Sequence, residues 1–465
     1  MNAHLLFTLL PLIVPPLGPK PDPLALFRQW VDSPSPDLRL QAARSLRGDR
    51  GSDSRAALLS LLSDPHPAVR AGVRDEIVAR PAAEGPDLAR GIAALREARA
   101  RVEGVRAILA RREDASPFAE DRDAEVRARA LFSRRVAAPL LRAGLRHADG
   151  RTRALSLEAL GEAESADAVA QDRAEEVRIA VTRLTASPAV VAELIGDASW
   201  RVRLAAMRAA ERLRPVAAIP ALIERVARDE GRVRARAVRA LENLTGAACG
   251  GDAKRWREWW GRAATGFVVP AAPAERPPDS TRSTIRFRKL PVESVRLAFV
   301  LDASRSMTEL APGSEGKSRW DIVVHDLGEI VHRLPSEARF NVILFRTEVE
   351  AWKPRLTAAS SGARAACRKW IEEAAPAGWT NLFDAVALAL ADDDVDALFI
   401  LTDGVPSRGA ETKRRAILDE IEYLNRFRMV QINCVQAGGA EGLNKAWDGF
   451  LEELAKAHEG VSVRE

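Results

Sequence analysis

Two patterns of apolar residues divide the chain. Over residues 24–265, apolar positions recur at helical spacing, and Val202, Ala206 and Ala209, for example, fall on one helical face. After residue 284, short continuous apolar runs such as 297–301 alternate with helical stretches. Runs of that length and composition are typical of strands buried on both faces of a sheet. The chain is therefore predicted to be an all-α solenoid followed by a doubly wound α/β domain.

One short unit recurs within the helical half. An Asp, often beside Pro or Ser, precedes a small apolar residue and an Arg, and an Ala-rich amphipathic helix follows. The arginines that mark this unit after residue 120 are Arg127, Arg153, Arg178, Arg203 and Arg234. Their spacing is that of stacked helical pairs. We expect the Asp to cap its helix, and the Asp and Arg of neighbouring units to pair.

This unit resembles short HEAT-like repeats, and the resemblance covers most of residues 24–245. It implies an extended surface built from stacked helix pairs. The pattern is blurred over 80–120, where the number of repeats is left open. At the far end, Trp256, Trp259 and Trp260 share one helical segment. A cap over the last apolar face is the favoured interpretation, because terminal repeats must be closed. An exposed aromatic binding patch is the alternative.

The second half is predicted to contain strands and helices in alternation. Four segments make up the whole: a leader over 1–23, helical repeats over 24–265, a Pro-rich linker over 266–283 and the α/β domain over 284–465. Predicted strands are 295–301, 340–345, 349–352 as a short antiparallel edge, 397–401, 429–435 and 461–463. Predicted helices are 318–333, 361–374, 382–391, 411–427 and 444–458.

Oxygen-bearing side chains follow two of the buried strands. Asp302, Ser304 and Ser306 come directly after the first strand, Asp403 follows the 397–401 strand, and Thr380 lies in a turn before a helix. If the two strands are parallel neighbours, Asp302 and Asp403 emerge side by side at the edge where ligands bind in such sheets. Two carboxylates and three hydroxyls, without His or Cys, suit Mg²⁺ or Mn²⁺. Helix capping by the two aspartates is the competing interpretation.

The pattern Asp302-x-Ser304-x-Ser306 with the distant Thr380 and Asp403 resembles the metal-ion-dependent adhesion site of von Willebrand factor type A (vWA) domains. The resemblance covers roughly residues 284–465. It implies a non-enzymatic protein-binding, adhesion or scaffold function, in which a partner's Asp or Glu carboxylate completes the metal's coordination. Arg305 stands where many members of the family have Gly. It either points to water or weakens cation binding and favours an acidic partner.

Two other functions are weighed against protein binding. A metal-dependent hydrolase would use the same ion to activate water, but no general base or nucleophile elbow stands beside the motif. Nucleic-acid binding would use the repeat array, in which basic residues exceed acidic ones. The repeat arginines alternate with carboxylates and form no continuous basic stripe, so a solvated, salt-bridged surface is the favoured interpretation.

The remaining features concern the cellular compartment. Cys249, Cys367 and Cys434 share no metal-binding spacing, and their odd number excludes a closed disulfide framework. The apolar stretch 5–14 predicts an export signal, and so a periplasmic or secreted protein. A retained anchor helix or a leader without structure is the alternative, and a cytoplasmic location stays open. No other stretch has transmembrane length.

Overall fold

The computed structural model describes residues 22–271, 285–311, 313–437 and 447–464. They form two compact units, one that ends at Ala107 and one that begins at Ile108. The predicted leader, most of the Pro-rich linker and the start of the predicted 444–458 helix lie outside these residues, and the predicted domain bounds stay a prediction. Within the described ranges, no helix has both the length and the apolar character that a membrane span requires.

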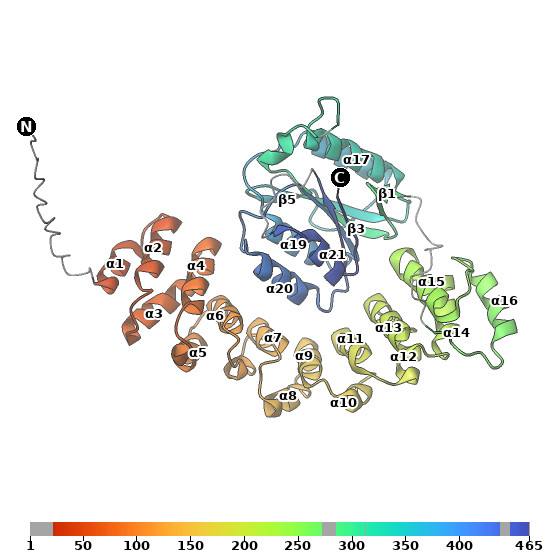
Figure 1. The fold of residues 1–465 in the computed structure, drawn as a ribbon, viewed down its shortest axis with the longest axis horizontal. Helices are drawn as coiled ribbons and strands as arrows, with labels where there is room; N and C mark the ends of the chain where they lie inside the picture. The colour runs from red at the N-terminus through yellow and green to blue at the C-terminus, as the bar shows by residue number, and fades with distance from the viewer. Residues whose placement is uncertain (1–21, 272–284, 312, 438–446, 465) are drawn as a thin grey trace, which may run out of the picture. The chain divides into compact units, whose positions relative to one another are not determined.

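The N-terminal region is all helical, as predicted, and its helices pack on one another (Figure 1). In the second unit, α7, α9, α11, α13 and α15 pack in succession, with α8, α12 and α14 against them. The helices are α1 Pro23–Trp30, α2 Pro36–Ser45, α3 Ser52–Ser60, α4 Pro67–Val78, α5 Gly85–Ala93, α6 Ala98–Ala110, α7 Ala124–Phe132, α8 Ala138–Gly144, α9 Gly150–Leu160, α10 Ala163–Asp167, α11 Glu175–Leu184, α12 Pro188–Leu194, α13 Trp200–Leu213, α14 Ala218–Arg228, α15 Gly231–Thr245 and α16 Ala253–Ala263.

Apolar stripes hold this array together. On α13, Val202 and Ala206 are fully buried and Ala209 is 2% exposed. Burial of such stripes supplies the main stabilising term, at about 25 cal/mol per Å² of apolar surface removed from water. Because many of these residues are alanines, neighbouring helices can approach closely. The apolar residues that the sequence predicts at helical spacing are thus the residues that form the buried core.

The recurring arginines bind the backbone of their own repeat unit, and some of them also bind the next repeat unit. Each donates from Nη1 to the backbone carbonyl six residues before it, over 2.6–2.9 Å; they are Arg39, Arg70, Arg101, Arg127, Arg153, Arg178 and Arg203. Four of them also bind an Asp of the following unit through two nitrogens: Arg39 with Asp64, Arg153 with Asp172, Arg178 with Asp197 and Arg203 with Asp229. Such two-pronged pairs are among the strongest polar contacts in proteins.

The predicted capping role holds for only some of the aspartates. Asp123 and Asp149 accept hydrogen bonds from the first amides of α7 and α9. Asp172 and Asp197 stand two residues before the N-cap of the next helix, and their carboxylates bind arginines of the preceding unit. In the blurred stretch, Arg101 makes the same carbonyl contact as the other arginines, although no Asp precedes it at the usual place.

The last helix closes the array. Trp256 on α16 is fully buried, and its indole nitrogen donates to the Gly250 carbonyl over 2.7 Å. Trp259 and Trp260 are half-buried and pack against Phe267, with ring centroids 5.5 and 5.6 Å away. Helix α16 contacts α14. These contacts agree with the predicted capping role.

The C-terminal domain is built on a mixed sheet with the strand order β5-β4-β3-β7-β8-β9. Strands β4, β3, β7, β8 and β9 run parallel, whereas β5 and β6 pair antiparallel with β4. The strands are β1 Arg286–Phe287, β2 Leu290–Pro291, β3 Arg296–Asp302, β4 Arg339–Phe345, β5 Val349–Ala351, β6 Thr357–Ala358, β7 Ala397–Thr402, β8 Gln431–Gln436 and β9 Ser462–Arg464; the helices are α17 Arg319–Arg333, α18 Ser361–Glu372, α19 Leu382–Leu390, α20 Arg414–Asn425 and α21 Phe450–Ala457.

Helices cover both faces of this sheet. Residues of α17 and α18, such as Val323 and Ile371, share one buried cluster with Phe299 and Phe340. The opposite cluster joins α19, α20 and α21 to the same strands. Central strands buried on both faces explain the continuous apolar runs in the sequence. The doubly wound fold is confirmed, including the short antiparallel edge strand β5; the β1–β2 hairpin and β6 were not predicted.

Within the second compact unit, the C-terminal domain contacts the successive helices α7, α9, α11, α13 and α15, which we call the inner helices. Arg232 donates to the carbonyls of Asp396 and Met429 over 2.9 and 2.6 Å. Glu459 pairs with Arg208, Arg232 and Arg236. Burial alone would raise the pKa of Glu459, but Arg236, Arg208 and Arg232 together hold it below its usual value. These arginines form salt bridges, as the sequence predicts, but they form them with the α/β domain and not at a solvated surface.

A second part of this contact surrounds Tyr423 on α20. The guanidinium groups of Arg129 and Arg151 lie 4.1 and 4.6 Å from the centroid of its ring. Arg129 also donates to Glu420 over 2.6 Å. Cation–π contacts with an aromatic ring add to the apolar burial. Tyr423 is 2% exposed and is the single tyrosine of the sequence.

His458 is buried near Arg208 of this contact, and its side chain is neutral. Asn425 Oδ1 accepts from the Val430 amide, so its Nδ2 is the atom that faces His458 Nδ1, at 3.0 Å. That geometry requires an unprotonated Nδ1. Burial, together with the nearby Arg208, lowers the pKa of His458 to about 4.

The pairing between repeat units should carry measurable stability. Replacing Asp197 by Ala leaves the part-buried Arg178 without its carboxylate, and we expect a loss of roughly 2–4 kcal/mol in the free energy of unfolding. Urea denaturation of the full chain measures it. Asp53→Ala, at an exposed position on α3, is the matched control and should change stability by less than about 0.5 kcal/mol. Equal effects of the two substitutions would contradict the role of the pair.

His458 should make stability depend on pH. Its pKa in the folded state lies below the unfolded value, so the unfolded chain binds more protons between about pH 4 and pH 6.5. Stability should therefore fall as the pH drops through that window, by roughly 1–3 kcal/mol. Urea denaturation at pH 7.5 and pH 4.5 measures the change, and His458→Gln should reduce it. An unchanged pH dependence in the variant would assign the effect to other groups.

Candidate functional site

The register between β3 and β7 sets the positions of the two aspartates. The strands pair in parallel with Leu301 opposite Leu401. Asp302 is therefore level with Thr402, and Asp403 lies one residue farther along. The aspartates share the carboxyl edge of the sheet, as predicted, but they are staggered by one residue and do not emerge strictly side by side.

Asp302 is fully buried at the end of β3. Its Oδ1 accepts from the Ser304 amide over 2.8 Å, and its Oδ2 accepts from Thr402 Oγ1 over 2.6 Å. Burial raises its pKa to about 6, and the charge of Asp403 acts in the same direction, while the bonds from Ser304 and Thr402 oppose the shift. A carboxylate held in this way gains from any cation placed beside it.

A chain of hydrogen bonds joins the two serines to Asp403. The hydroxyls of Ser304 and Ser306 lie 3.1 Å apart, and Ser306 Oγ donates to Asp403 Oδ1 over 2.7 Å. Ser304 is buried and Ser306 is half-buried. Three of the predicted residues, from two separate segments, thus lie in direct contact.

Thr380 approaches from a third segment, just before α19. A methyl group placed on Gly404 would lie 3.3 Å from Thr380 Oγ1 and 3.9 Å from Ser306 Oγ. The Thr380 carbonyl accepts from the amides of Ser407 and Arg408, over 2.9 and 3.2 Å. The structure therefore brings all five predicted residues to one place, and the absence of a side chain at Gly404 leaves room between them.

The arginine that enters this site is Arg319, not Arg305. Arg319, at the start of α17, donates from Nη1 to Asp403 Oδ2 over 2.6 Å and also pairs with Glu309 at 3.1 Å. Arg305 is exposed, as one interpretation of the sequence predicts. Both oxygens of Asp403 are thus occupied, one by Ser306 and one by a guanidinium.

The donor set fits a hard divalent cation. Its side-chain donors are oxygens, two of them carboxylates, which is what Mg²⁺ or Mn²⁺ prefers. Two buried carboxylates at one edge also call for positive charge, of which Arg319 supplies one unit to Asp403. In the ranges that the structure describes, no group of three or more His, Cys, Asp or Glu side chains could hold a metal. A zinc site of the usual kind is therefore not present among these residues.

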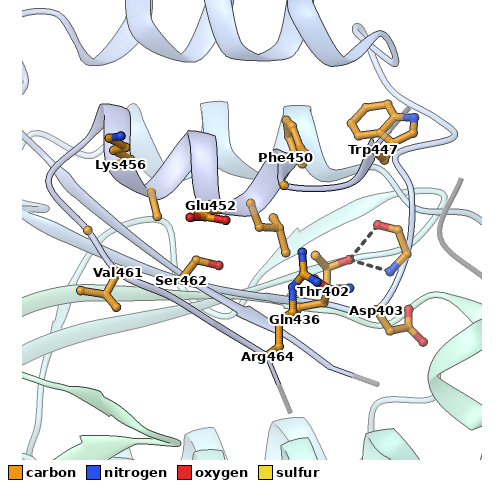
Figure 2. Close-up of a pocket in the computed structure, with 15 residues that line it drawn as sticks. Thr402, Asp403, Gln436, Trp447, Phe450, Glu452, Lys456, Val461, Ser462 and Arg464 are labelled. Atoms are coloured by element: carbon orange, nitrogen blue, oxygen red, sulfur yellow. Dashed lines mark hydrogen bonds between the residues drawn. The ribbon is translucent and has the colours of Figure 1, made fainter. Parts of the chain in front are cut away.

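A pocket of about 480 Å³ opens beside Asp403, between α21 and the ends of β7, β8 and β9 (Figure 2). Thr402 and Asp403 lie at one end and Lys456 and Val461 at the other. Thr402 Oγ1 also accepts from the Gly404 amide over 3.2 Å. Of the five predicted residues, only Asp403 lines this pocket, so the oxygen cluster is a separate feature at its end.

Sequence reasoning missed two residues of the site. Thr402 holds Asp302, and comparing the last residues of the two runs, Leu301-Asp302 and Leu401-Thr402, would have placed it there. The sequence around Arg319 does not indicate its role in the site, because that role depends on how the loop before α17 folds back to the sheet.

The comparisons with known proteins agree with this geometry. Residues 295–463 match the family described as von Willebrand factor type A domain. The chain therefore carries a vWA domain preceded by a largely helical N-terminal region.

Curated relatives match about a third of this chain. Human von Willebrand factor A domain-containing protein 3B is 26% identical over 158 residues, which are 34% of this chain and 11% of that protein. Human inter-alpha-trypsin inhibitor heavy chain H4 is 28% identical over 180 residues, 36% of this chain and 18% of that protein. The chain thus spans less than a fifth of the length of these two relatives.

Solved structures match this chain at low sequence identity. An aerotolerance-related membrane protein from Bacteroides fragilis is 19% identical, with a TM-score of 0.28; the match covers 36% of this chain and 90% of that one. A von Willebrand factor type A protein from Catenulispora acidiphila is 18% identical, with a TM-score of 0.30, over 38% of this chain and 40% of that one. Nothing about function follows from scores at this level.

Arg319 should compete with a divalent cation for Asp403. Arg319→Gln removes a positive charge within hydrogen-bonding distance of the carboxylate, and we expect Mn²⁺ affinity to rise by roughly tenfold, since nearby like charges repel by about 1–4 kcal/mol. Isothermal titration with Mn²⁺ measures the affinity. Arg305→Gln is the matched control, because that arginine is exposed, and should change affinity less than about threefold. Weaker binding in Arg319→Gln would show that this arginine organises the site.

Proposed function

We propose that this chain is a non-enzymatic binding protein whose vWA domain holds Mg²⁺, or Mn²⁺, in a metal-ion-dependent adhesion site. The ligands would be Asp302, Ser304, Ser306, Thr380 and Asp403. One observation carries the proposal: oxygens from three distant segments meet at one sheet edge, where Ser306 donates to Asp403 over 2.7 Å. Helix capping alone does not account for that convergence.

The residues of the site would leave the cation able to accept a further ligand. When bound, the cation supplies a Lewis-acidic point for a carboxylate oxygen from a partner's Asp or Glu. The hydroxyls of Ser304, Ser306 and Thr380 are neutral and do not cancel its charge. Asp302, fixed by Ser304 and Thr402, and Asp403 would bind the cation or its water molecules.

A binding function is supported over a hydrolase by the groups around the site. Hydrolysis needs a base within reach of the attacking water. His325 and His332 of α17 are exposed, and no contact among the described residues joins them to the site. Glu309, in the loop before α17, pairs with Arg319. The match of residues 295–463 to vWA domains, which commonly bind proteins, also supports a binding function.

The helical array is proposed to be a HEAT-like solenoid that offers a second interaction surface. The arginines at its repeated positions bind carbonyls and aspartates, which disfavours nucleic acid as the partner. Part of its inner face already contacts the vWA domain. Export to the periplasm or the outside of the cell is part of the proposal and rests on the apolar stretch 5–14, which lies outside the described residues.

Asp302→Asn tests the metal site with little change in shape. The amide can still accept from the Ser304 amide, but it brings no charge, and we expect Mn²⁺ affinity to fall by more than about a hundredfold. Isothermal titration of the full chain measures the affinity, and circular dichroism confirms that the fold is kept.

Glu350→Gln serves as the matched control, because this exposed carboxylate on β5 has no part in the proposed site. It should bind Mn²⁺ like the wild type. If Asp302→Asn binds the ion with unchanged affinity, the five residues do not form the metal site and the proposal fails.

A further inference from the structure

Exposed side chains border the five oxygens. Trp379 is 56% exposed and directly precedes Thr380. Arg305 stands between Ser304 and Ser306 and is exposed, as is Arg408. Large apolar groups left open beside a polar site are typical of an interaction surface. We call Trp379, Arg408 and Arg305 the rim.

The backbone holds Trp379 in place. Gly378 has a φ of 72°, and a methyl group there would lie 2.2 Å from Thr347 Oγ1, so the turn requires glycine. The Gly378 carbonyl accepts from the Arg305 amide over 3.3 Å, and the Trp379 amide donates to Thr347 over 3.2 Å. A side chain on such a fixed turn loses little freedom when it binds a partner.

Arg408 completes a shelf with Trp379. Its guanidinium lies 5.8 Å from the Trp379 ring centroid, within the range of a cation–π contact. Its amide donates to the carbonyl of Thr380, over 3.2 Å. The indole, the arginine and the proposed ligand Thr380 therefore belong to one connected loop pair, and a group resting on the shelf would lie next to the metal site.

The charges of the rim favour an acidic partner. Arg305 and Arg408 are exposed cations, whereas Glu309, a carboxylate of the neighbouring loop, is bound to Arg319. A divalent cation in the site would add to the positive potential. Oppositely charged patches speed association and exclude wrongly charged partners.

We propose that the rim selects an acidic protein segment in which the metal-binding Asp is flanked by a large apolar residue and by a second carboxylate. The apolar residue packs on Trp379 and the second carboxylate pairs with Arg408. This inference rests on the proposed adhesion-site function. It adds a partner class, because a metal site alone would accept any exposed carboxylate.

Two blocked peptides test the proposal on the full chain in Mg²⁺: Gly-Leu-Asp-Glu-Gly, and Gly-Gly-Asp-Gly-Gly without the flanking groups. We expect the first to bind at least about tenfold tighter by isothermal titration, since a buried aromatic anchor commonly contributes a factor of this size. Trp379→Ala should cut the preference to less than about threefold and leave Mn²⁺ affinity unchanged. Arg408→Gln should also reduce the preference for the first peptide, because the Glu of that peptide then lacks its cationic partner.

The controls separate this inference from the function on which it rests. Leu388→Ala removes an equally apolar exposed side chain from α19, outside the rim, and should keep the preference. Equal Mg²⁺-dependent binding of both peptides, or a preference that survives Trp379→Ala, would overturn the rim proposal alone. If neither peptide binds in Mg²⁺, carboxylate recognition and the rim proposal both fail. Tighter binding of a single-stranded oligothymidine, lost in Trp379→Ala, would reassign the rim to nucleic acid.

Discussion

The parallel pairing of β3 with β7 is the constraint on which the proposed site depends. It fixes Leu301 against Leu401 and so puts Thr402 beside Asp302 and Asp403 one residue beyond. Without that register, the hydroxyl of Thr402 could not hold the buried carboxylate, and Ser306 could not reach Asp403. The pairing itself is stabilised by the two apolar layers that cover the sheet. Burial of apolar surface and placement of polar oxygens are thus two results of one arrangement.

Arginine has three structural roles in this chain. At the repeated positions it satisfies a backbone carbonyl and an aspartate of the next unit. On the inner helices it binds the vWA domain, as Arg232 does. In the site, Arg319 neutralises Asp403. The planar guanidinium suits all three, since it presents several donors in a fixed geometry and keeps its charge when buried.

Much of the fold could be predicted from the sequence because the burial of one face of a helix or of a whole strand gives the apolar residues a regular spacing. The run ending in Asp302 and the stripe on α13 are read directly from apolar spacing. The five site residues could also be chosen, because each follows a buried strand or opens a helix. The one-residue stagger could not, since every residue of a run buried on both faces looks alike, so register leaves no mark. Arg319 and the arginines of the inner face were missed for a different reason: an arginine bound to a distant carboxylate has the same local sequence as one in water.

The contact between the inner helices and the vWA domain has a consequence for how this chain could vary. An ordinary array of stacked repeats can gain or lose one unit, because each unit touches only its neighbours. Here Arg129, Glu158, Arg208 and Arg232, on four of the five helices α7, α9, α11, α13 and α15, each contact the vWA domain. Deleting a unit between α7 and α15 would shift these groups out of phase with their acceptors. The domain therefore acts as a template that fixes the number of repeats in this stretch.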